Sequence, residues 1–247
     1  LQRVAALSQA AAAGDSNVSV HAAVDDERVA QHCRDIGVSY LMTPPECPSG
    51  TDRCAAAVAQ LKTPPDFILN MQGDAPLTPP DFLTAMIASF AANACDVITP
   101  VTQMTWEQLD KLRDAKKTTP FSGTTTAFDA KTGKAFWFSK NIIPALRAED
   151  KLRQAGTLSP VWRHIGIYGY SAVMLKKYLS LPEGVFEKLE GLEQLRVIEN
   201  GYVMRCVPVD YKGRASMSGV DSPEDVARAE SLIAKHGELI PAKKGVA

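Results

Sequence analysis

The alternation of short β-rich runs with longer helical segments is the feature that most constrains how this chain folds. Four segments rich in apolar and β-branched residues are expected strands: 18–24, 40–42, 67–71 and 97–101. Segments with helical periodicity separate them, such as the alanine-rich stretch 51–61. Strand–helix alternation is typical of βαβ crossovers, which place parallel strands side by side under helices. The sequence therefore predicts an α/β fold with a mostly parallel central sheet flanked by helices on both faces.

The middle of the chain follows another pattern. Residues 123–128 and 135–138 flank the turn sequence 129–133 and predict a hairpin, a smaller antiparallel insertion in the fold. The charged stretch 147–153 is expected to belong to the same insertion. The remaining elements are predicted as a strand, a helix, a strand and the entrance of a last helix, at 165–170, 187–200, 203–207 and 221–225.

Composition excludes several classes of function. The formal net charge is −1 over 247 residues, with a pI of about 6.5, which argues against a nucleic-acid partner. The five cysteines are widely spaced and form no C-x-x-C pair, so neither a disulfide framework nor a structural zinc site is expected. No apolar run reaches the roughly 20 residues of a membrane-spanning helix. A reducing cytoplasm fits this cysteine usage best.

Two aspartates stand where ligands bind in open α/β sheets, outside the carboxyl ends of the strands. Asp74 follows an expected strand through a Gln-Gly step, and Asp221 precedes the last helix, whose start is marked by Ser222 as N-cap, Pro223 and Asp225. Two converging carboxylates commonly hold Mg²⁺ on substrate phosphates, and we expect their oxygens within about 6 Å of each other. A turn cap and a favourable helix-dipole charge are the alternative roles.

Further polar residues have both a structural and a functional interpretation. The loop 49–53 opens a helix and could bind a base, ribose or phosphate, or could simply be a helix cap with an exposed Arg53. His164 is either a core histidine or a group presented to a ligand. Glu193 and Arg196 have the spacing of an ordinary surface pair on a helix.

Together these segments resemble the CMP-Kdo synthetases, or 3-deoxy-manno-octulosonate cytidylyltransferases. The matching segments follow the family's order over nearly the whole chain: 25–29, 49–53, 70–76, 138–140 with 143–144, 164–170, 192–196 and 219–225. The most specific are His-Ile-Gly-Ile-Tyr-Gly-Tyr, Leu-Glu-Gln-Leu-Arg and Gly-Val-Asp-Ser-Pro-Glu-Asp. The resemblance implies a Rossmann-like nucleotidyltransferase fold.

The resemblance also implies a role for each matching residue. Asp74 and Asp221 would be catalytic and would bind Mg²⁺. The cytidine pocket would include Ser49, Gly50, Arg53 and Gln72. The sugar-acid pocket would include Ser139, Lys140, His164, Tyr168, Glu193 and Gln194. The implied reaction transfers CMP from CTP to a 3-deoxy-ulosonic acid, Kdo above all, and releases pyrophosphate. The family further implies a cytoplasmic homodimer that acts in lipopolysaccharide precursor synthesis.

Three departures from the family pattern keep alternatives open. The family's front strand and phosphate-binding loop, Ile-Pro-Ala-Arg-x-x-Ser-x-Arg-x-Pro-x-Lys-Pro, has no counterpart, because the chain begins just after it. We expect an open sheet edge beside 18–24 and 67–71, and weak CTP binding by this chain alone. Lys140 replaces the family's arginine, and residues 124–127 read Thr-Thr-Thr-Ala instead of Val-Lys-Val-Val. The acid could therefore be 8-amino-Kdo or a sialate.

The expected organisation has a discontinuous core. Residues 1–110 and 201–240 would form the nucleotide-binding core, 111–200 the sugar-binding and dimerisation region, and 241–247 a flexible tail. A glycosyltransferase is disfavoured because the segment 72–76 lacks the second aspartate of an Asp-x-Asp pair. A non-catalytic, degenerate homologue is the remaining rival, although both expected metal aspartates are present.

Overall fold

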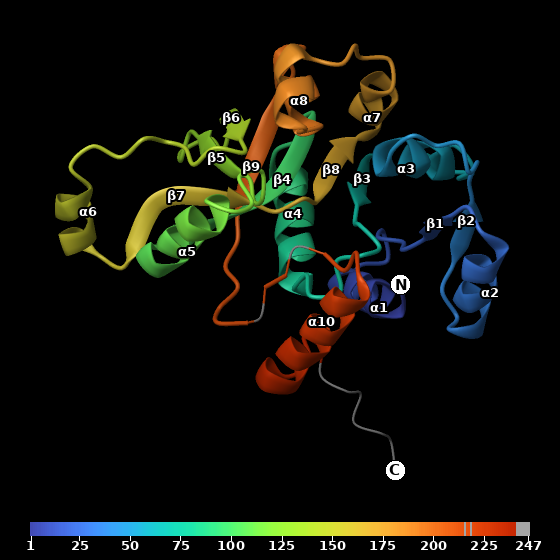
Figure 1. Ribbon diagram of the computed structural model, residues 1–247. Coiled ribbons are helices and arrows are strands. Elements are labelled where there is room, and N and C mark those ends of the chain that lie inside the picture. Colours follow the sequence, from blue (N-terminus) through green and yellow to red (C-terminus); the bar gives the residue numbers. More distant parts are fainter. Residues whose placement is uncertain (215, 218, 241–247) are drawn as a thin grey trace. The chain divides into compact units, whose positions relative to one another are not determined.

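The computed structural model describes residues 1–214, 216–217 and 219–240 (Figure 1). The chain forms two compact units. The first comprises residues 1–88 together with the chain from 211 onward, and the second comprises residues 89–210. The tail expected at 241–247 lies outside the described residues.

The first unit is built of helices and short strands. Its elements are α1 (Gln2–Ala12), β1 (Ala22–Val24), α2 (Glu27–Asp35), β2 (Tyr40–Met42), α3 (Gly50–Val58), β3 (Phe67–Asn70), most of α4 (Pro80–Ala92) and α10 (Pro223–His236). β1 and β2 pair in parallel, with Val24 opposite Met42, and α2 is the crossover between them. Among the described residues β1 pairs with β2 alone. The predicted βαβ unit over residues 18–42 is therefore confirmed.

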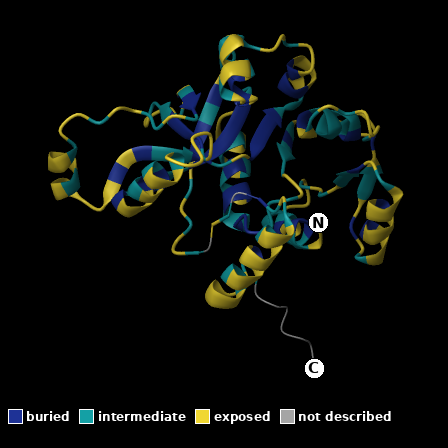
Figure 2. Cartoon of the chain, in the orientation of Figure 1, coloured by how far each residue is buried: buried dark blue, intermediate teal, exposed yellow. Residues whose placement is uncertain are grey.

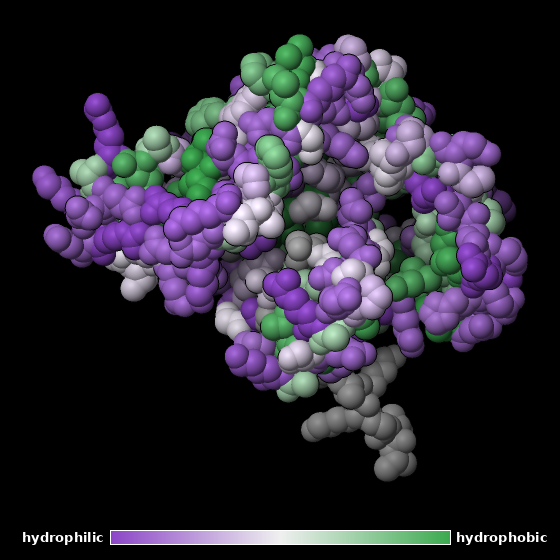
Figure 3. Space-filling model, in the orientation of Figure 1, coloured by the Kyte–Doolittle hydropathy of each residue, from purple (hydrophilic) through white to green (hydrophobic). Residues whose placement is uncertain are grey.

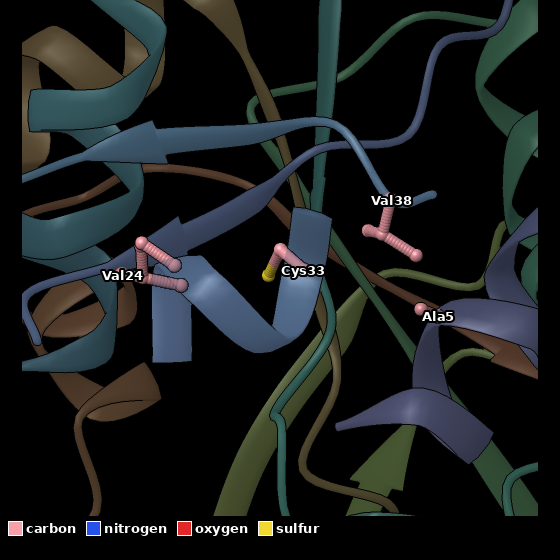
Figure 4. Close-up of a cluster of buried hydrophobic side chains, with 5 residues drawn as sticks. Ala5, Val24, Cys33 and Val38 are labelled. Atoms are coloured by element: carbon pink, nitrogen blue, oxygen red, sulfur yellow. The ribbon is translucent and has the colours of Figure 1, made fainter. Parts of the chain in front are cut away.

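A small apolar core holds this βαβ unit together. Val24 on β1, Cys33 on α2 and Val38 after it are buried, and Ala5 of α1 joins the same cluster (Figure 4). α2 begins at its N-cap Asp26, whose carboxylate accepts a hydrogen bond from the Arg28 N–H. The core and the N-cap together hold the loop after β1 against the first turn of α2.

The last helix also starts where the sequence indicates. The Ser222 hydroxyl accepts the Asp225 N–H, the Asp225 carboxylate accepts the Ser222 N–H, and Pro223 is the first helical residue. This capping box satisfies backbone donors that the first turn leaves open. The predicted start of α10 is confirmed, and Asp221 stands immediately before it.

The second unit contains the larger sheet. Its elements are β4 (Val97–Thr105), α5 (Trp106–Lys116), β5 (Thr125–Phe128), β6 (Ala135–Ser139), α6 (Glu149–Ala155), β7 (Leu158–His164), β8 (Tyr168–Ser171), α7 (Ala172–Tyr178), α8 (Val185–Glu190), α9 (Gln194–Glu199) and β9 (Met204–Pro208). β4 is central, and most of its residues are buried (Figure 2). It pairs in parallel with β9 and antiparallel with β7 and β8.

The expectation of a mostly parallel sheet is wrong for this unit. The β5–β6 hairpin is present as predicted, and β5 pairs antiparallel with β7. Among the described strands of this unit, four of the five pairings are antiparallel, and only the β4–β9 pairing is parallel. The reason is β7, which the sequence did not reveal because Pro160 and the polar residues around it interrupt its apolar pattern. A tight turn joins β5 to β6, so this antiparallel pairing needs no crossover helix.

Two other predicted elements differ from the structure. The helix expected over 187–200 is two helices, α8 and α9, because Gly191 ends α8 with a φ of +61°. The charged stretch 147–153 lies largely in α6, where Arg153 and Glu149 form ion pairs with residues of α5. The surface over α5 and α6 is correspondingly hydrophilic (Figure 3). None of the helices in the described part of the chain has the length and apolar character needed to span a bilayer.

Candidate active site

Asp74 and Asp221 lie close together in the first unit. A Cβ atom placed on Gly219 would be 3.0 Å from Asp74 Oδ2 and 3.7 Å from Asp221 Oδ2. These two distances place the carboxylate oxygens within about 6.7 Å of each other. The Val220 N–H donates to the Asp74 carbonyl at 2.9 Å and so holds the segment before α10 against the loop after β3. The predicted separation of about 6 Å or less between the two carboxylates is compatible with this upper limit and stays a prediction.

An open cavity of about 270 Å³ borders the same carboxylate. Its walls come from α1, the loop after β3 and α10, and include Gly73, Asp74, Val220 and Ile233. Most of these walls are apolar, so the Asp74 carboxylate is one of the few charged groups that face the cavity. The space beside Asp74 can therefore admit another group.

The donor set of this pair suits a hard divalent cation. Two carboxylates supply oxygen ligands, which Mg²⁺ prefers, and Mg²⁺ usually takes its remaining ligands from water and substrate phosphates. Among the described residues no group of three or more acidic, histidine or cysteine side chains could hold a metal. Asp74 and Asp221 would thus hold an ion that shares its coordination with a substrate.

The residues expected around cytidine are also in the first unit. Ser49 caps α3 by accepting the Asp52 N–H, and its hydroxyl donates to the Asp52 carboxylate at 2.5 Å. Arg53 forms an ion pair with Asp25 at 2.7 Å and donates to Thr43 Oγ1 at 2.9 Å. Both side chains are therefore engaged inside the unit.

Gly50 and Gln72 come together at the start of α3. A Cβ atom on Gly50 would lie 4.0 Å from Gln72 Nε2, so the absence of a side chain there leaves the Gln72 amide accessible. Gln72 itself is exposed. The structure thus brings Gly50 and Gln72 into one place, while Ser49 and Arg53 shape the loop around them.

In the second unit His164 is a buried, neutral base. Its side chain ends β7 with 9% of its surface exposed, beneath the Phe138 ring. Burial, and then the positive charge of Lys140, lower its pKa to about 3. The Thr99 hydroxyl donates to the Ile167 carbonyl at 2.8 Å and lies 2.9 Å from His164 Nε2. Because that hydroxyl has one proton, Nε2–H donates to it and Nδ1 keeps its lone pair as an acceptor.

Tyr168 and Gln194 form a second buried polar pair. The Tyr168 hydroxyl donates to Gln194 Oε1 at 3.0 Å, and the Tyr168 ring lies 5.6 Å from the His164 ring between centroids. Gln194 is 3% exposed, and its Nε2 is buried without a hydrogen-bond partner. An unpaired buried amide costs roughly 1–3 kcal/mol, so the two N–H groups are donors that await an acceptor.

Ser139 and Lys140 end β6 beside α8. The Ser139 hydroxyl donates to Glu190 at 2.8 Å and accepts the Asn141 N–H at 2.9 Å, so its one proton is used within the protein. The Lys140 N–H donates to the other oxygen of Glu190 at 2.7 Å. The Lys140 ammonium makes no hydrogen bond or ion pair with any residue that the structure describes.

Glu193 stands between the two short helices and is exposed. Its carbonyl accepts the Tyr178 hydroxyl at 3.4 Å. Arg196, whose sequence spacing is that of a surface pair with Glu193, forms an ion pair at 2.6 Å with the buried Glu187 of α8. The Arg196–Glu187 ion pair joins α9 to α8, on either side of Glu193.

Several residues of these sites could not be found from the sequence. Thr99, which sets the tautomer of His164, lies in an apolar strand, and Glu190, which holds Ser139 and Lys140, is one of two acids on a short helix. Asp25 was visible in a matching segment, but its pairing with Arg53 joins positions 28 residues apart. Each partnership is tertiary and leaves no local pattern.

The geometry can now be compared with known proteins. The family profile described as cytidylyltransferase matches residues 4–209. This chain belongs to the cytidylyltransferase family. Among curated relatives of this cytidylyltransferase, a 3-deoxy-manno-octulosonate cytidylyltransferase of Maricaulis maris is 39% identical over 88% of this chain and 82% of its own. One of the same name from Zea mays is 35% identical over 85% of this chain and 65% of its own.

A solved structure is similar over nearly the whole cytidylyltransferase chain. It is a CMP:2-keto-3-deoxy-manno-octonic acid synthetase complexed with CTP, with 26% identity and a TM-score of 0.78. The match covers 94% of this chain and 88% of the other. The α/β nucleotidyltransferase-like fold expected from the sequence is thereby confirmed, with its main sheet mostly antiparallel.

Proposed function

We propose that this cytidylyltransferase transfers CMP from CTP to 3-deoxy-manno-octulosonate and releases pyrophosphate. The observation that carries the choice of acceptor is the buried, unpaired Nε2 of Gln194 next to Tyr168 and His164. A polyhydroxylated acid supplies both the acceptor that this amide lacks and the donor that His164 Nδ1 can receive. The names of the relatives and the CTP-bound structural neighbour support the same reaction.

The acceptor pocket combines neutral and charged recognition. His164 and Gln194 offer one acceptor and two donors in a water-poor setting, where hydrogen bonds to sugar hydroxyls are strong. The Lys140 ammonium offers a point charge to the acid's carboxylate. Because its pKa is lowered to about 3, His164 carries no charge near neutral pH and can accept hydrogen bonds from hydroxyl groups.

The nucleotide site combines an adaptable loop with an acidic pair. Gly50 and Gln72 would contact cytidine, and Ser49 and Arg53 would keep their loop in place. Asp74 and Asp221 would hold Mg²⁺, which neutralises phosphate charge and acidifies the attacking hydroxyl when bound. The anomeric hydroxyl forms a bond to the α-phosphorus as the bond to pyrophosphate breaks, so the protein's task is positioning and electrostatics.

The working protein is proposed to be a cytoplasmic homodimer in lipopolysaccharide precursor synthesis. The second unit exposes apolar side chains that a second copy could cover. Phe136 of β6 is 58% exposed, and Leu189 of α8 is 73% exposed. Phe186 of α8 is 48% exposed and contacts Trp137 of β6 edge to face, so these two side chains form one apolar area. Light scattering after gel filtration tests the dimer: a monomer at micromolar concentration contradicts it.

The substrate assignment is tested by pyrophosphate release from CTP. Full-length protein is assayed with 3-deoxy-manno-octulosonate, its 8-amino analogue and a sialic acid, with Mg²⁺ present. The proposal expects the highest kcat/KM with 3-deoxy-manno-octulosonate. A higher value with either other acid reassigns the acceptor, and release with none of the three contradicts the proposed transfer.

A further inference from the structure

The end of α5 carries a lysine that is bound entirely to backbone. Lys116 Nζ lies 2.5 Å from both the Ser122 and the Lys140 carbonyls, and 3.2 Å from the carbonyls of Pro120 and Gly123. An ammonium has three protons, so these four acceptors use its full capacity. Burial and the charges of Lys140 and Arg163 lower the pKa of Lys116, while Glu190 opposes that shift.

The four carbonyls belong to two separate segments. Three lie in the loop that leads from α5 into β5, and the fourth is at the end of β6. Lys116 therefore ties the loop at 120–123 to the carbonyl of Lys140. Its charge makes each of these hydrogen bonds stronger than a neutral one.

An anion holds the other side of the backbone at the end of β6. Glu190 accepts the Ser139 hydroxyl and the Lys140 N–H with its two oxygens, at 2.8 and 2.7 Å. The peptide of Lys140 is thus bound on its carbonyl side by a cation and on its N–H side by an anion. Its side chain is left unpaired among the described residues.

We propose that Lys116 is a positioning residue for the acceptor: by holding the backbone at Lys140, it fixes where the Lys140 ammonium meets the carboxylate of the sugar acid. This inference rests on the proposed function, because it assumes an acidic acceptor.

The chain supplies a matched control for this proposal. Lys117 is the next residue, and its ammonium pairs at 2.7 Å with Asp114 on the surface, where both side chains are about three-quarters exposed. Lys116→Met and Lys117→Met remove the same group from adjacent positions. Lys116→Met should raise the KM for the sugar acid about tenfold, since a shift of a few tenths of an ångström at a binding group is costly, and leave the KM for CTP within twofold. Lys117→Met should change neither.

A double-mutant cycle separates positioning from a merely structural role. If Lys116 acts through Lys140, then Lys116→Met should add less than a twofold rise in sugar-acid KM in a Lys140→Met background. An equal penalty in both backgrounds, or no change of KM in Lys116→Met alone, overturns the proposal. If Lys116→Met fails to fold, Glu190→Gln is measured in the same cycle with the same expectation.

A second readout is independent of turnover. Hydrogen exchange over residues 138–141 should be faster in Lys116→Met than in Lys117→Met, and equal rates contradict the backbone restraint. A wild-type protein that releases no pyrophosphate with any sugar acid contradicts the proposed function. An active wild type with an unaffected Lys116→Met variant contradicts only the positioning role.

Discussion

The two polar sites of this chain differ in how they keep their groups available. In the first unit Asp74 and Asp221 are carboxylates beside an open cavity and a helix start. In the second unit His164, Tyr168 and Gln194 are buried and uncharged; Tyr168 donates to Gln194, and His164 is hydrogen-bonded to Thr99. In the proposed function the first site receives a cation and the second the hydroxyl groups of the acceptor.

The difference follows from the cost of burial. An isolated buried charge is far more costly than a buried amide or imidazole, so carboxylates that must receive a cation stay near water. A buried neutral group can be left with one bond unmade at a cost of roughly 1–3 kcal/mol, as at Gln194 Nε2. A ligand that supplies the missing partner recovers that energy. The comparison therefore predicts charge-dependent behaviour in the first unit and hydrogen-bond-dependent behaviour in the second.

The largest expected effect is the loss of a carboxylate in the first unit. Asp74→Asn and Asp221→Asn should each lower kcat by about a thousandfold or more, because metal stabilisation of the phosphoryl charge is worth several kcal/mol. Circular dichroism should show an unchanged fold. Glu224→Gln, an exposed acid in the first turn of α10, is the control and should keep its activity. Turnover by both asparagine variants at the wild-type rate would remove the metal role.

Substitution in the second unit should act on the acceptor alone. His164→Ala and Glu193→Ala should raise the KM for the sugar acid or lower kcat by about ten- to a hundredfold, as expected for one or two lost hydrogen bonds. The affinity for CTP, measured by calorimetry, should stay within about twofold of wild type. His32→Ala, a surface histidine, serves as control. Equal damage to CTP affinity in both variants would show that the two sites are not separate in function.

The neutral state of His164 should also be visible in stability. The usual histidine pKa is 6.5 and burial lowers that of His164 to about 3, so below pH 6.5 the unfolded chain binds a proton that the folded chain refuses. The free energy of unfolding should therefore fall as the pH drops from 6.5 towards 3, by up to about 1.4 kcal/mol per pH unit.

Denaturant titrations of wild type and His164→Asn between pH 6.5 and 4.5 measure this contribution. In that window the two carboxylates with strongly lowered pKa values, Asp26 and Glu149 at about 2, remain ionised in the folded protein and add little. The variant should show the shallower slope. An imidazole NMR signal of His164 that titrates near pH 6.5 in the folded protein would contradict the buried neutral state.

The smallest expected effect tests how closely the two carboxylates are placed. The added methyl group of Gly219→Ala would lie 3.0 Å from Asp74 Oδ2, which must move by a few tenths of an ångström. We expect kcat to fall several-fold, less than in Asp74→Asn, with a rise in the Mg²⁺ concentration needed for half-maximal rate. Gly73→Ala, where the added atom meets nothing within 4 Å, is the control. An unchanged Mg²⁺ requirement in Gly219→Ala would contradict the proposal that Asp74 binds the metal.

Local signals predicted much of the fold. The βαβ unit over residues 18–42, the β5–β6 hairpin and the capping box at Ser222 were readable because each depends on residues close in sequence. The parallel sheet was mispredicted because strand direction in the second unit depends on β7, whose pairings with β4 and β5 join distant segments. The helix expected over 187–200 contains Gly191, which ends α8. The helical pattern of Leu-Glu-Gln-Leu directly after it favoured one continuous helix.

The candidate site divides in the same way. The twelve candidate residues came from segments that resemble a family, and the structure separates those whose side chains are free to meet a ligand from those that hold others. Ser139 and Arg53 are of the second kind, because each is already paired within its unit. The sequence could not make that distinction, because Glu190 and Asp25, the partners of Ser139 and Arg53, are distant from them along the chain.

One contact in the segment that carries Glu193 and Gln194 has a consequence for related chains. The Glu199 carboxylate accepts the N–H groups of Phe186 and Glu187 at 2.9 and 2.8 Å, and a Cβ atom on Gly184 would lie 1.9 Å from its Oε2. A side chain at position 184 would therefore push the Glu199 carboxylate away from the two N–H groups that it accepts. We expect the pair to be inherited as a unit, and an alignment in which the two vary freely would contradict this.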